Sequence, residues 1–329
     1  MTRLLDIVTA GHAELIPYSA LREAGFTSRA VGALTRAGEL VRTRRGIYVR
    51  GEVWRTADPD QRYRLFVLSA AATAERPLVL SHLSAAVVHG LPIIGAWPRT
   101  VHTMDPGATG GSTARFTTSH RGAPIPDTVV RDGIAVTSLA RTLVDVAAGT
   151  SFLAGVTMID HALRVEQERV ADEALRGIRG QPALNKTDLF DELAAVNPRC
   201  GARQAGQAIR FGNGLAANAG ESLSRVRMFQ LGFEVPELQA CFANVQGHDY
   251  WVDFYWRRIR KIGEFDGKLK YTRGAVLGDR DPGHVVWAEK RREDALRFHV
   301  RSFDRWDWAT VLSPQRFHRF LTERGMPRA

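Results

Sequence analysis

Cysteine, long apolar runs and secretion signals are scarce or missing in this sequence of 329 residues. Its two cysteines, Cys200 and Cys241, supply neither a disulfide framework nor a CxxC metal site. No run approaches the ~18 apolar residues of a membrane span, and the first residues lack the apolar core of a signal peptide. We therefore expect a cytoplasmic protein that has no membrane partner.

Lysine is also rare, because only five lysines stand among the 45 basic residues. The basic residues outnumber the acids, and the net charge is +10. A surplus of this size favours a polyanionic partner, with nucleic acid ahead of a membrane surface. The alternative is that the many arginines reflect genome composition and carry no binding role.

The richest pattern lies late in the chain, where two aromatic and β-branched stretches flank a basic turn. Residues 250–256 read as a strand with Asp253 in its middle, and residues 262–267 read as the return strand, with Glu264 and Asp266 on one face. The hairpin therefore brings Asp253 and Glu264 to the same neighbourhood. Carboxylates gathered in this way repel one another unless a cation lies between them, and Mg²⁺ or Mn²⁺ is the usual one.

Two further segments accompany the acidic hairpin. Glu221 begins an amphipathic helical stretch upstream, and Arg291 and Arg292 belong to a basic helix that is expected to start near Ala288. The alternative interpretation is an ordinary surface hairpin with two acids, followed by a charged surface helix. The order of the three features favours a metal site with arginines beside it that hold a DNA backbone.

This region, from about residue 220 to 312, resembles the PD-(D/E)XK nuclease superfamily, in the branch related to very-short-patch repair endonucleases. The resemblance covers roughly the last third of the chain. The matching segments are residues 220–222, 231–233, Pro236, Gln239, 252–254, 264–268 and 289–294.

The resemblance implies hydrolysis of a phosphodiester. Asp253 and Glu264 would bind Mg²⁺, which would activate a water, and Glu221 would complete the outer shell of the metal. A lysine usually follows the second acid by two places in this superfamily, but Asp266 stands there in this chain. Lys268 or Lys270 would then supply the positive charge.

The first 52 residues show a second pattern, in which three short helices precede a basic hairpin. Helices are expected at residues 2–13, 18–24 and 28–37, with Thr27 or Ser28 as a cap, and the hairpin spans residues 40–49. This is the order of a winged helix-turn-helix. The third helix would enter the major groove, and the hairpin would contact phosphates or the minor groove. The candidate DNA-binding residues are Arg29, Arg36, Arg42, Arg44 and Arg45.

The amino-terminal segments at residues 16–21, 28–34 and 40–48 resemble AbiEi-type antitoxins, which are transcriptional repressors. Segments at residues 82–91 and 137–145 extend this resemblance to about residue 165. It implies DNA as a partner and a cognate toxin protein as a further one. The alternatives are a small helical domain with a basic face and a winged helix that contacts protein.

The middle of the chain shows no catalytic motif. His82 and His89 are more simply structural than metal-binding, and Asp145 is expected to pair with Arg141 four residues earlier. Length and patterning predict an α/β fold class, more narrowly a multidomain α+β protein. The expected parts are a winged helix at 1–55, an α+β middle domain at 56–170, a helical connector at 171–219 and an endonuclease-like domain with a mixed sheet at 220–329.

Two functions remain open from the sequence. The first is a DNA-binding protein with a Mg²⁺-dependent, endonuclease-like carboxyl-terminal domain that serves a toxin–antitoxin, defence or repair system. The second is a non-catalytic antitoxin and transcriptional repressor, in which the nuclease fold is degenerate and the residue at position 266 is a trace of that loss.

Overall fold

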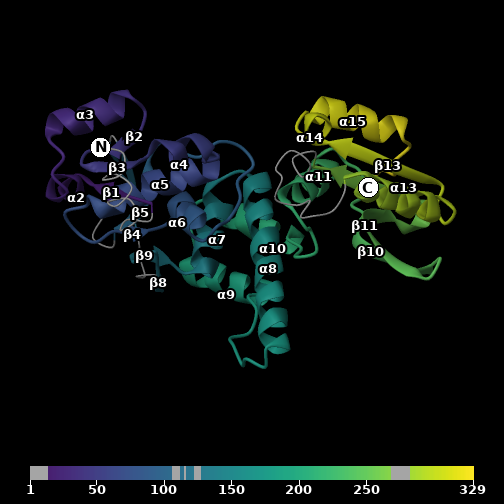
Figure 1. Cartoon of the computed structure of the whole chain (residues 1–329). Helices are drawn as coiled ribbons and strands as arrows, with labels where there is room; N and C mark the ends of the chain where they lie inside the picture. The colour runs from purple at the N-terminus through teal and green to yellow at the C-terminus, as the bar shows by residue number, and fades with distance from the viewer. Residues whose placement is uncertain (1–13, 106–111, 115, 122–126, 268–281) are drawn as a thin grey trace. The chain divides into compact units, whose positions relative to one another are not determined.

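The computed structural model describes residues 14–105, 112–114, 116–121, 127–267 and 282–329. The chain is a mixed α+β protein with three sheets (Figure 1). Its internal contacts define two compact units. The first unit holds residues 1–155 and 185–209, and the second holds residues 156–184 and 210–329. The expected connector at 171–219 is therefore divided between the two units.

The first unit begins with a small sheet and two helices. The order is β1 (Ile16–Pro17), α2 (Tyr18–Glu23), α3 (Ser28–Arg36), β2 (Leu40–Arg44) and β3 (Ile47–Arg50), and the strands pair in the order β1-β3-β2. Thr27 caps α3 by accepting a hydrogen bond from the backbone N–H of Ala30, which confirms the expected cap. Leu21, Val31 and Leu34 form the buried core. The expected helix at residues 2–13 lies outside the described residues.

A six-stranded mixed sheet forms the rest of the first unit, with strand order β6-β7-β5-β4-β9-β8. Its strands and helices are α4 (Gly51–Thr56), α5 (Pro59–Ala72), β4 (Val79–Leu80), α6 (His82–Val88), β5 (Val101–Asp105), β6 (Ser112–Ala114), β7 (Thr117–Arg121), β8 (Thr128–Arg131), β9 (Ile134–Thr137), α7 (Leu139–Gly149), α9 (Lys186–Val196) and α10 (Ala202–Phe211). Ser138 caps α7 and Asn185 caps α9, because the side chain of each accepts a backbone hydrogen bond at the start of its helix.

The second unit is built on a four-stranded sheet with strand order β10-β11-β12-β13. Its elements are most of α8 (Phe152–Leu175), α11 (Ala219–Gln230), β10 (Glu237–Val245), β11 (His248–Trp256), the 3-10 turn η1 (Arg257–Ile259), β12 (Lys261–Asp266), α13 (Pro282–Arg297), β13 (Ser302–Asp307), α14 (Trp308–Val311) and α15 (Pro314–Glu323). β10, β11 and β12 are antiparallel, whereas β12 and β13 are parallel.

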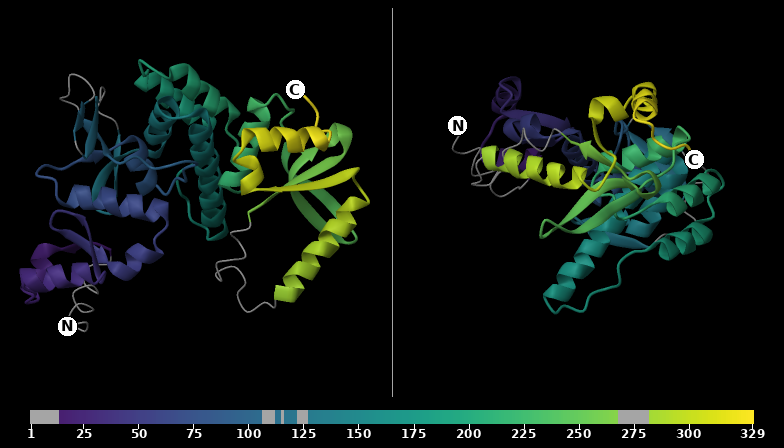
Figure 2. Two further views of the ribbon diagram at one scale, coloured as in Figure 1. Left: turned by 90° about the horizontal axis from the view of Figure 1, so that it is seen from above. Right: turned by 90° about the vertical axis from the view of Figure 1, so that its right-hand side faces the viewer.

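Helices cover both faces of this sheet, as Figure 2 shows for α13 and α15. Leu296 of α13 packs with Ile262 and Phe303. Trp306 faces the other way, because its ring lies near Phe317 of α15 and its indole N–H donates to Ser224 Oγ of α11 at 2.8 Å. The sheet is thus buried on both sides, and its strand ends remain available for polar groups.

Candidate functional site

The acidic hairpin ends in a polar cavity of about 210 Å³ in the second unit. Asp253 comes from β11, and Glu264 and Asp266 come from β12, so the structure brings these three acids together. Two arginines and a fourth acid complete the polar lining. The lining residues are Asp253, Glu264, Phe265, Asp266, Gly267, Glu289, Arg292 and Arg305.

Glu264 lies at the centre of the charges in this cavity, and its side chain is mostly buried. Its Oε1 accepts a hydrogen bond from Arg292 Nη2 at 2.7 Å, and its Oε2 accepts one from Arg305 Nε at 3.2 Å. Burial raises the pKa of Glu264, and the neighbouring charge of Asp253 raises it further, whereas Arg292 and Arg305 lower it. The two guanidinium groups therefore offset the cost of burying this carboxylate.

Glu289 of α13 joins the two arginines to each other. Its Oε1 lies 3.1 Å from Arg292 Nη1 and 2.6 Å from Arg305 Nη2. Arg292 also donates from Nη2 to the backbone carbonyl of Trp251 at 2.5 Å. Burial alone would lower the pKa of Arg292, but the hydrogen bonds and charges of the acids raise it, so the guanidinium group stays charged. The result is a network that fixes α13 against the hairpin.

Asp253 is oriented by the backbone of the neighbouring strand. Its Oδ2 accepts a hydrogen bond from the N–H of Phe265 at 2.9 Å. A carboxylate that accepts a backbone hydrogen bond is held in one orientation. Asp253 is therefore fixed at the cavity next to Glu264.

The donor set fits a hard divalent cation by chemistry, because carboxylate oxygens are the ligands that Mg²⁺ prefers. The arrangement of these oxygens differs from a closed metal cage. Both oxygens of Glu264 are engaged by arginine, and within the part of the chain that the structure describes no three His, Cys, Asp or Glu side chains form a metal-binding group. A cation at this site would thus rest on two carboxylates and on water.

Glu221 lies at the first turn of α11 and does not line the cavity. Its side chain is buried, and it accepts hydrogen bonds from the N–H of Ala217 at 2.8 Å, from Asn218 Nδ2 at 2.6 Å and from Gln239 Nε2 at 3.3 Å. These contacts tie the start of α11 to β10. The expected Lys268 and the neighbouring Lys270 lie outside the described residues.

Arg305 and Glu289 were not among the candidate residues from the sequence, although both line the cavity. β13 runs from Ser302 to Asp307 and pairs Arg305 directly with Glu264 in parallel register. Phe303 and Arg305 share one face of this strand and Trp306 lies on the other, so residues 302–307 show no simple alternation of apolar and polar side chains that would have identified Arg305.

The candidate DNA-binding arginines have different environments. Arg29 and Arg36 of α3 are exposed, and so are Arg42 and Arg45 of the hairpin. Arg44 differs, because it is half-buried, its guanidinium carbon lies 5.7 Å from the ring centre of Phe116, and its Nη1 is buried without a hydrogen bond. Four of these five arginines therefore face solvent.

The two basic-helix candidates also differ. Arg291 is exposed and stacks over the ring of Trp287, with 4.8 Å between the guanidinium carbon and the ring centre. Arg292 is committed to Glu264 and Glu289. The helix itself begins at Pro282, ahead of the expected start near Ala288. Of these two arginines, therefore, Arg291 has the exposed guanidinium group, and it forms no ion pair with the described residues.

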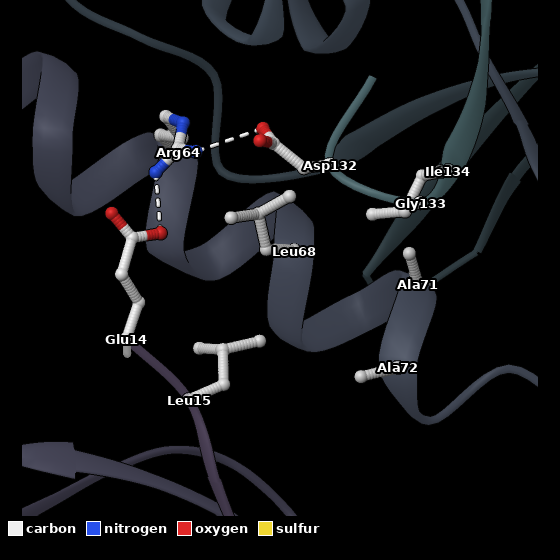
Figure 3. Close-up of a pocket in the computed structure, with 9 residues that line it drawn as sticks. All are labelled: Glu14, Leu15, Arg64, Leu68, Ala71, Ala72, Asp132, Gly133 and Ile134. Carbon is white, nitrogen blue, oxygen red and sulfur yellow. Dashed lines mark hydrogen bonds and ion pairs between the residues drawn. The ribbon is translucent and has the colours of Figure 1, made fainter. Parts of the chain in front are cut away.

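A larger cavity of about 620 Å³ lies in the first unit and is lined by Arg64, Leu68, Ala71, Ala72, Glu14, Leu15, Asp132, Gly133 and Ile134 (Figure 3). Among the described residues of this lining, Arg64 is the basic one, and two acids pair with it. Its Nη1 lies 2.5 Å from Glu14 Oε2 and its Nη2 lies 2.8 Å from Asp132 Oδ2. These three titratable groups neutralise one another, so the size of the cavity does not indicate a reactive site.

Comparison with protein-family models and with curated proteins yields no match for this chain. Among the described helices, none combines the length and the apolar character that a membrane span needs. The functional argument therefore rests on the geometry of the polar cavity and on the charged surfaces.

Proposed function

We propose that the chain is a cytoplasmic DNA-binding protein whose second unit hydrolyses phosphodiester bonds with Mg²⁺ or Mn²⁺. The observation that carries this proposal is the meeting of Asp253, Glu264 and Asp266 in one cavity, with two arginines at the same place. Acids that only stabilise a fold are usually paired singly with a base, whereas three acids gathered at a strand end favour a cation.

Each side chain of the cavity has a role in this chemistry. Asp253 and Glu264 would hold the metal, which when bound lowers the pKa of a water and polarises a phosphate oxygen. The hydrogen bond from Phe265 N–H keeps Asp253 in place for that role. Arg292 and Arg305 carry guanidinium groups, which bind phosphate oxygens through paired N–H donors. They would position the scissile phosphate beside the acids.

Exposed arginines outside the cavity support the same proposal. The exposed Arg29 and Arg36 lie on α3, and Arg42 and Arg45 lie on the β2–β3 hairpin. A short exposed basic helix followed by a basic hairpin is the arrangement with which winged helices bind a groove and its phosphates. We infer that the first unit targets the protein to DNA.

The experiment is a cleavage assay with purified full-length protein on supercoiled plasmid, single-stranded DNA and mismatched duplex. Each substrate is incubated with Mg²⁺, with Mn²⁺ and with EDTA. Asp253→Asn keeps the size of the side chain and an acceptor for Phe265 N–H, but removes the charge that a metal needs. Glu237→Gln is the matched control, because Glu237 is an exposed acid of the same sheet that pairs with Arg257 at 2.7 Å and does not line the cavity.

Cleavage that requires the metal, survives Glu237→Gln and is lost in Asp253→Asn would establish the nuclease. A loss of activity by at least about 100-fold is expected for Asp253→Asn, because metal-assisted activation of water supplies several kcal/mol of transition-state stabilisation. Cleavage that persists in Asp253→Asn would come from a contaminating enzyme and would refute the assignment.

A second function is favoured by a specific contact. Arg292 and Arg305 bind both oxygens of Glu264, and Asp266 occupies the place at which a lysine is usual. Such a site would serve as a rigid scaffold in a non-catalytic repressor and antitoxin that binds DNA and a cognate toxin. Retained DNA binding with no cleavage of any substrate, together with co-purification of the product of an adjacent gene, would favour this function.

A further inference from the structure

A separate cavity of about 340 Å³ lies within the first unit, and neither the proposed cleavage nor the proposed DNA contacts use it. Its walls come from the start of α6, the end of β7, the middle of α7 and the segment that follows α9. The lining residues are His82, Arg121, Arg141, Asp145, Val196, Asn197, Pro198 and Arg199. The cavity has the size of a small-molecule site.

Positive charge dominates this lining, since three arginines face one acid. Arg141 is 4% exposed, and its Nε donates to Asp145 Oδ1 at 3.0 Å. Its two Nη groups bind no acceptor among the residues that the structure describes. Arg121 and Arg199 are exposed at the rim. Glu192 of α9 also feels the charge of Arg141, but it does not line the cavity, so an anion would meet a net positive surface.

Asp145 offers a hydrogen-bond acceptor to a ligand in this cavity. It is 7% exposed, and its Oδ2 is buried without a hydrogen-bond donor. His82 Nδ1 lies 3.7 Å from this oxygen, which is too long for a hydrogen bond. Burial raises the pKa of Asp145 to about 6. A buried carboxylate oxygen without a donor is costly, and Asp145 lines the same cavity as the arginines.

The histidines behind this wall do not supply the missing donor. His82 stacks on His120 with 3.5 Å between ring centres, and His120 Nε2 lies 2.9 Å from His102 Nδ1. Burial lowers the pKa of His82 well below its usual value, so its ring is neutral at pH 7. The stack also fixes the ring plane, which keeps His82 from moving toward Asp145.

We propose that this cavity binds a small molecule that carries both a phosphate group and a hydroxyl group. The guanidinium groups of Arg121, Arg141 and Arg199 bind the phosphate oxygens, because an arginine fork matches the spacing of two such oxygens. The hydroxyl donates its hydrogen to Asp145 Oδ2. An inorganic phosphate ion would meet only the first requirement, and a neutral sugar would meet only the second.

Isothermal titration calorimetry of the full-length protein tests the proposal with ribose 5-phosphate, inorganic phosphate and ribose as probes. Ribose 5-phosphate is expected to bind at least about tenfold more tightly than inorganic phosphate, and ribose is expected not to bind. A variant with Arg121→Gln and Arg199→Gln removes two exposed charges without touching the core, and it should weaken ribose 5-phosphate by at least about tenfold.

A variant with Arg76→Gln and Arg99→Gln is the matched control, because both residues are exposed in the same unit and neither lines the cavity. It should bind ribose 5-phosphate as the unchanged protein does. Three results would overturn the proposal: no binding of any probe at millimolar concentration, equal affinity for phosphate and ribose 5-phosphate, or an equal loss in both double variants. The test is independent of DNA cleavage, since Asp253→Asn should leave these affinities unchanged.

Discussion

Arg292 Nη2 lies 2.7 Å from Glu264 Oε1, and this contact places a fixed positive charge where the acids of the β11–β12 hairpin meet. Arg305 approaches the second oxygen of the same carboxylate. The guanidinium groups thus take the electrostatic role that a divalent cation would have, since either one relieves the repulsion between carboxylates. A metal and Arg292 would compete for Glu264.

The first prediction concerns this competition. Arg292→Gln removes one of the two positive charges that lie beside the buried carboxylate of Glu264. The free energy of unfolding without metal should therefore fall by about 1–3 kcal/mol. Mg²⁺ should then restore stability, because Glu264 becomes available to it. Thermal unfolding with EDTA and with Mg²⁺ measures both effects, and the rise in Tm with Mg²⁺ should be larger in the variant than in the unchanged protein.

The control for that experiment is Arg297→Gln, which lies on the same helix and pairs at the surface with Glu293. It should change stability by less than about 0.5 kcal/mol and should leave the response to Mg²⁺ unaltered. If Arg292→Gln lowers stability and Mg²⁺ restores none of it, the hairpin acids do not form a metal site.

Local side-chain signals made much of this fold predictable from sequence. Thr27 or Ser28 was expected to cap a helix, and Thr27 accepts a backbone hydrogen bond at the start of α3. The Arg141–Asp145 ion pair was also expected, and its atoms lie 3.0 Å apart. These features depend on residues at most four positions apart, so their physics is contained in a short window of sequence.

Features that depend on distant packing were not predictable in the same way. The 24-residue helix α8 was missed, because its first half is apolar on several faces and its second half is charged, so it shows no single apolar stripe. The pairing of Glu264 with Arg305 depends on the parallel register of β12 and β13, two strands that are far apart in the sequence. No local pattern fixes such a register.

A second prediction follows from the most buried ion pair of the second unit. Asp160 is fully buried, its Oδ2 lies 3.1 Å from Arg225 Nη2, and it also accepts from Ser222 Oγ at 2.8 Å and from the N–H of Asn213 at 2.6 Å. Asp160→Ala strands the buried charge of Arg225, so the free energy of unfolding should fall by about 3–5 kcal/mol. Urea unfolding at pH 7 measures the loss.

Asp172→Ala provides the comparison for Asp160. Asp172 lies on the same helix, and its ion pair with Arg176 is largely exposed. An exposed pair of this kind contributes about 0–1 kcal/mol, so the variant should unfold at nearly the same urea concentration as the unchanged protein. A similarly small loss of unfolding free energy in both variants would contradict the prediction, because it would show that α8 tolerates the loss of its buried charge.

A third prediction concerns acid stability of the first unit. Burial lowers the pKa values of His82 and His120, and it lowers that of His102 to about 4. Below pH 6.5 these histidines therefore bind protons in the unfolded chain but stay largely neutral in the folded protein. The free energy of unfolding consequently falls as the pH falls. Asp145 opposes this, since its raised pKa favours the folded state as the pH falls below about 6. His102 alone should contribute a loss of about 2 kcal/mol between pH 7 and pH 5, and His82 and His120 add to this loss, so the net change remains a loss of stability.

Urea unfolding at the two pH values measures this loss. A variant with His102→Gln and His120→Gln should lose most of the difference, because it removes two of the groups that resist protonation. His248→Gln is the matched control, an exposed histidine of the second unit that should leave the difference unchanged. A protein that is as stable at pH 5 as at pH 7 would contradict the buried, neutral state of the histidine stack.

The last prediction separates the arginines of the β2–β3 hairpin by their exposure. Arg42 and Arg45 are exposed, whereas Arg44 is half-buried beside Phe116. A variant with Arg42→Ala and Arg45→Ala should weaken binding to a random-sequence duplex and reduce the slope of log affinity against log salt by about 2, since each lost phosphate contact removes roughly 0.9 released counterions. Fluorescence anisotropy between about 50 and 200 mM salt measures that slope.

Arg44→Ala changes the same kind of charge in the same hairpin, and its slope should stay close to that of the unchanged protein. If Arg44→Ala flattens the slope as much as the double variant does, the Arg44 side chain leaves Phe116 to reach the phosphates when DNA binds.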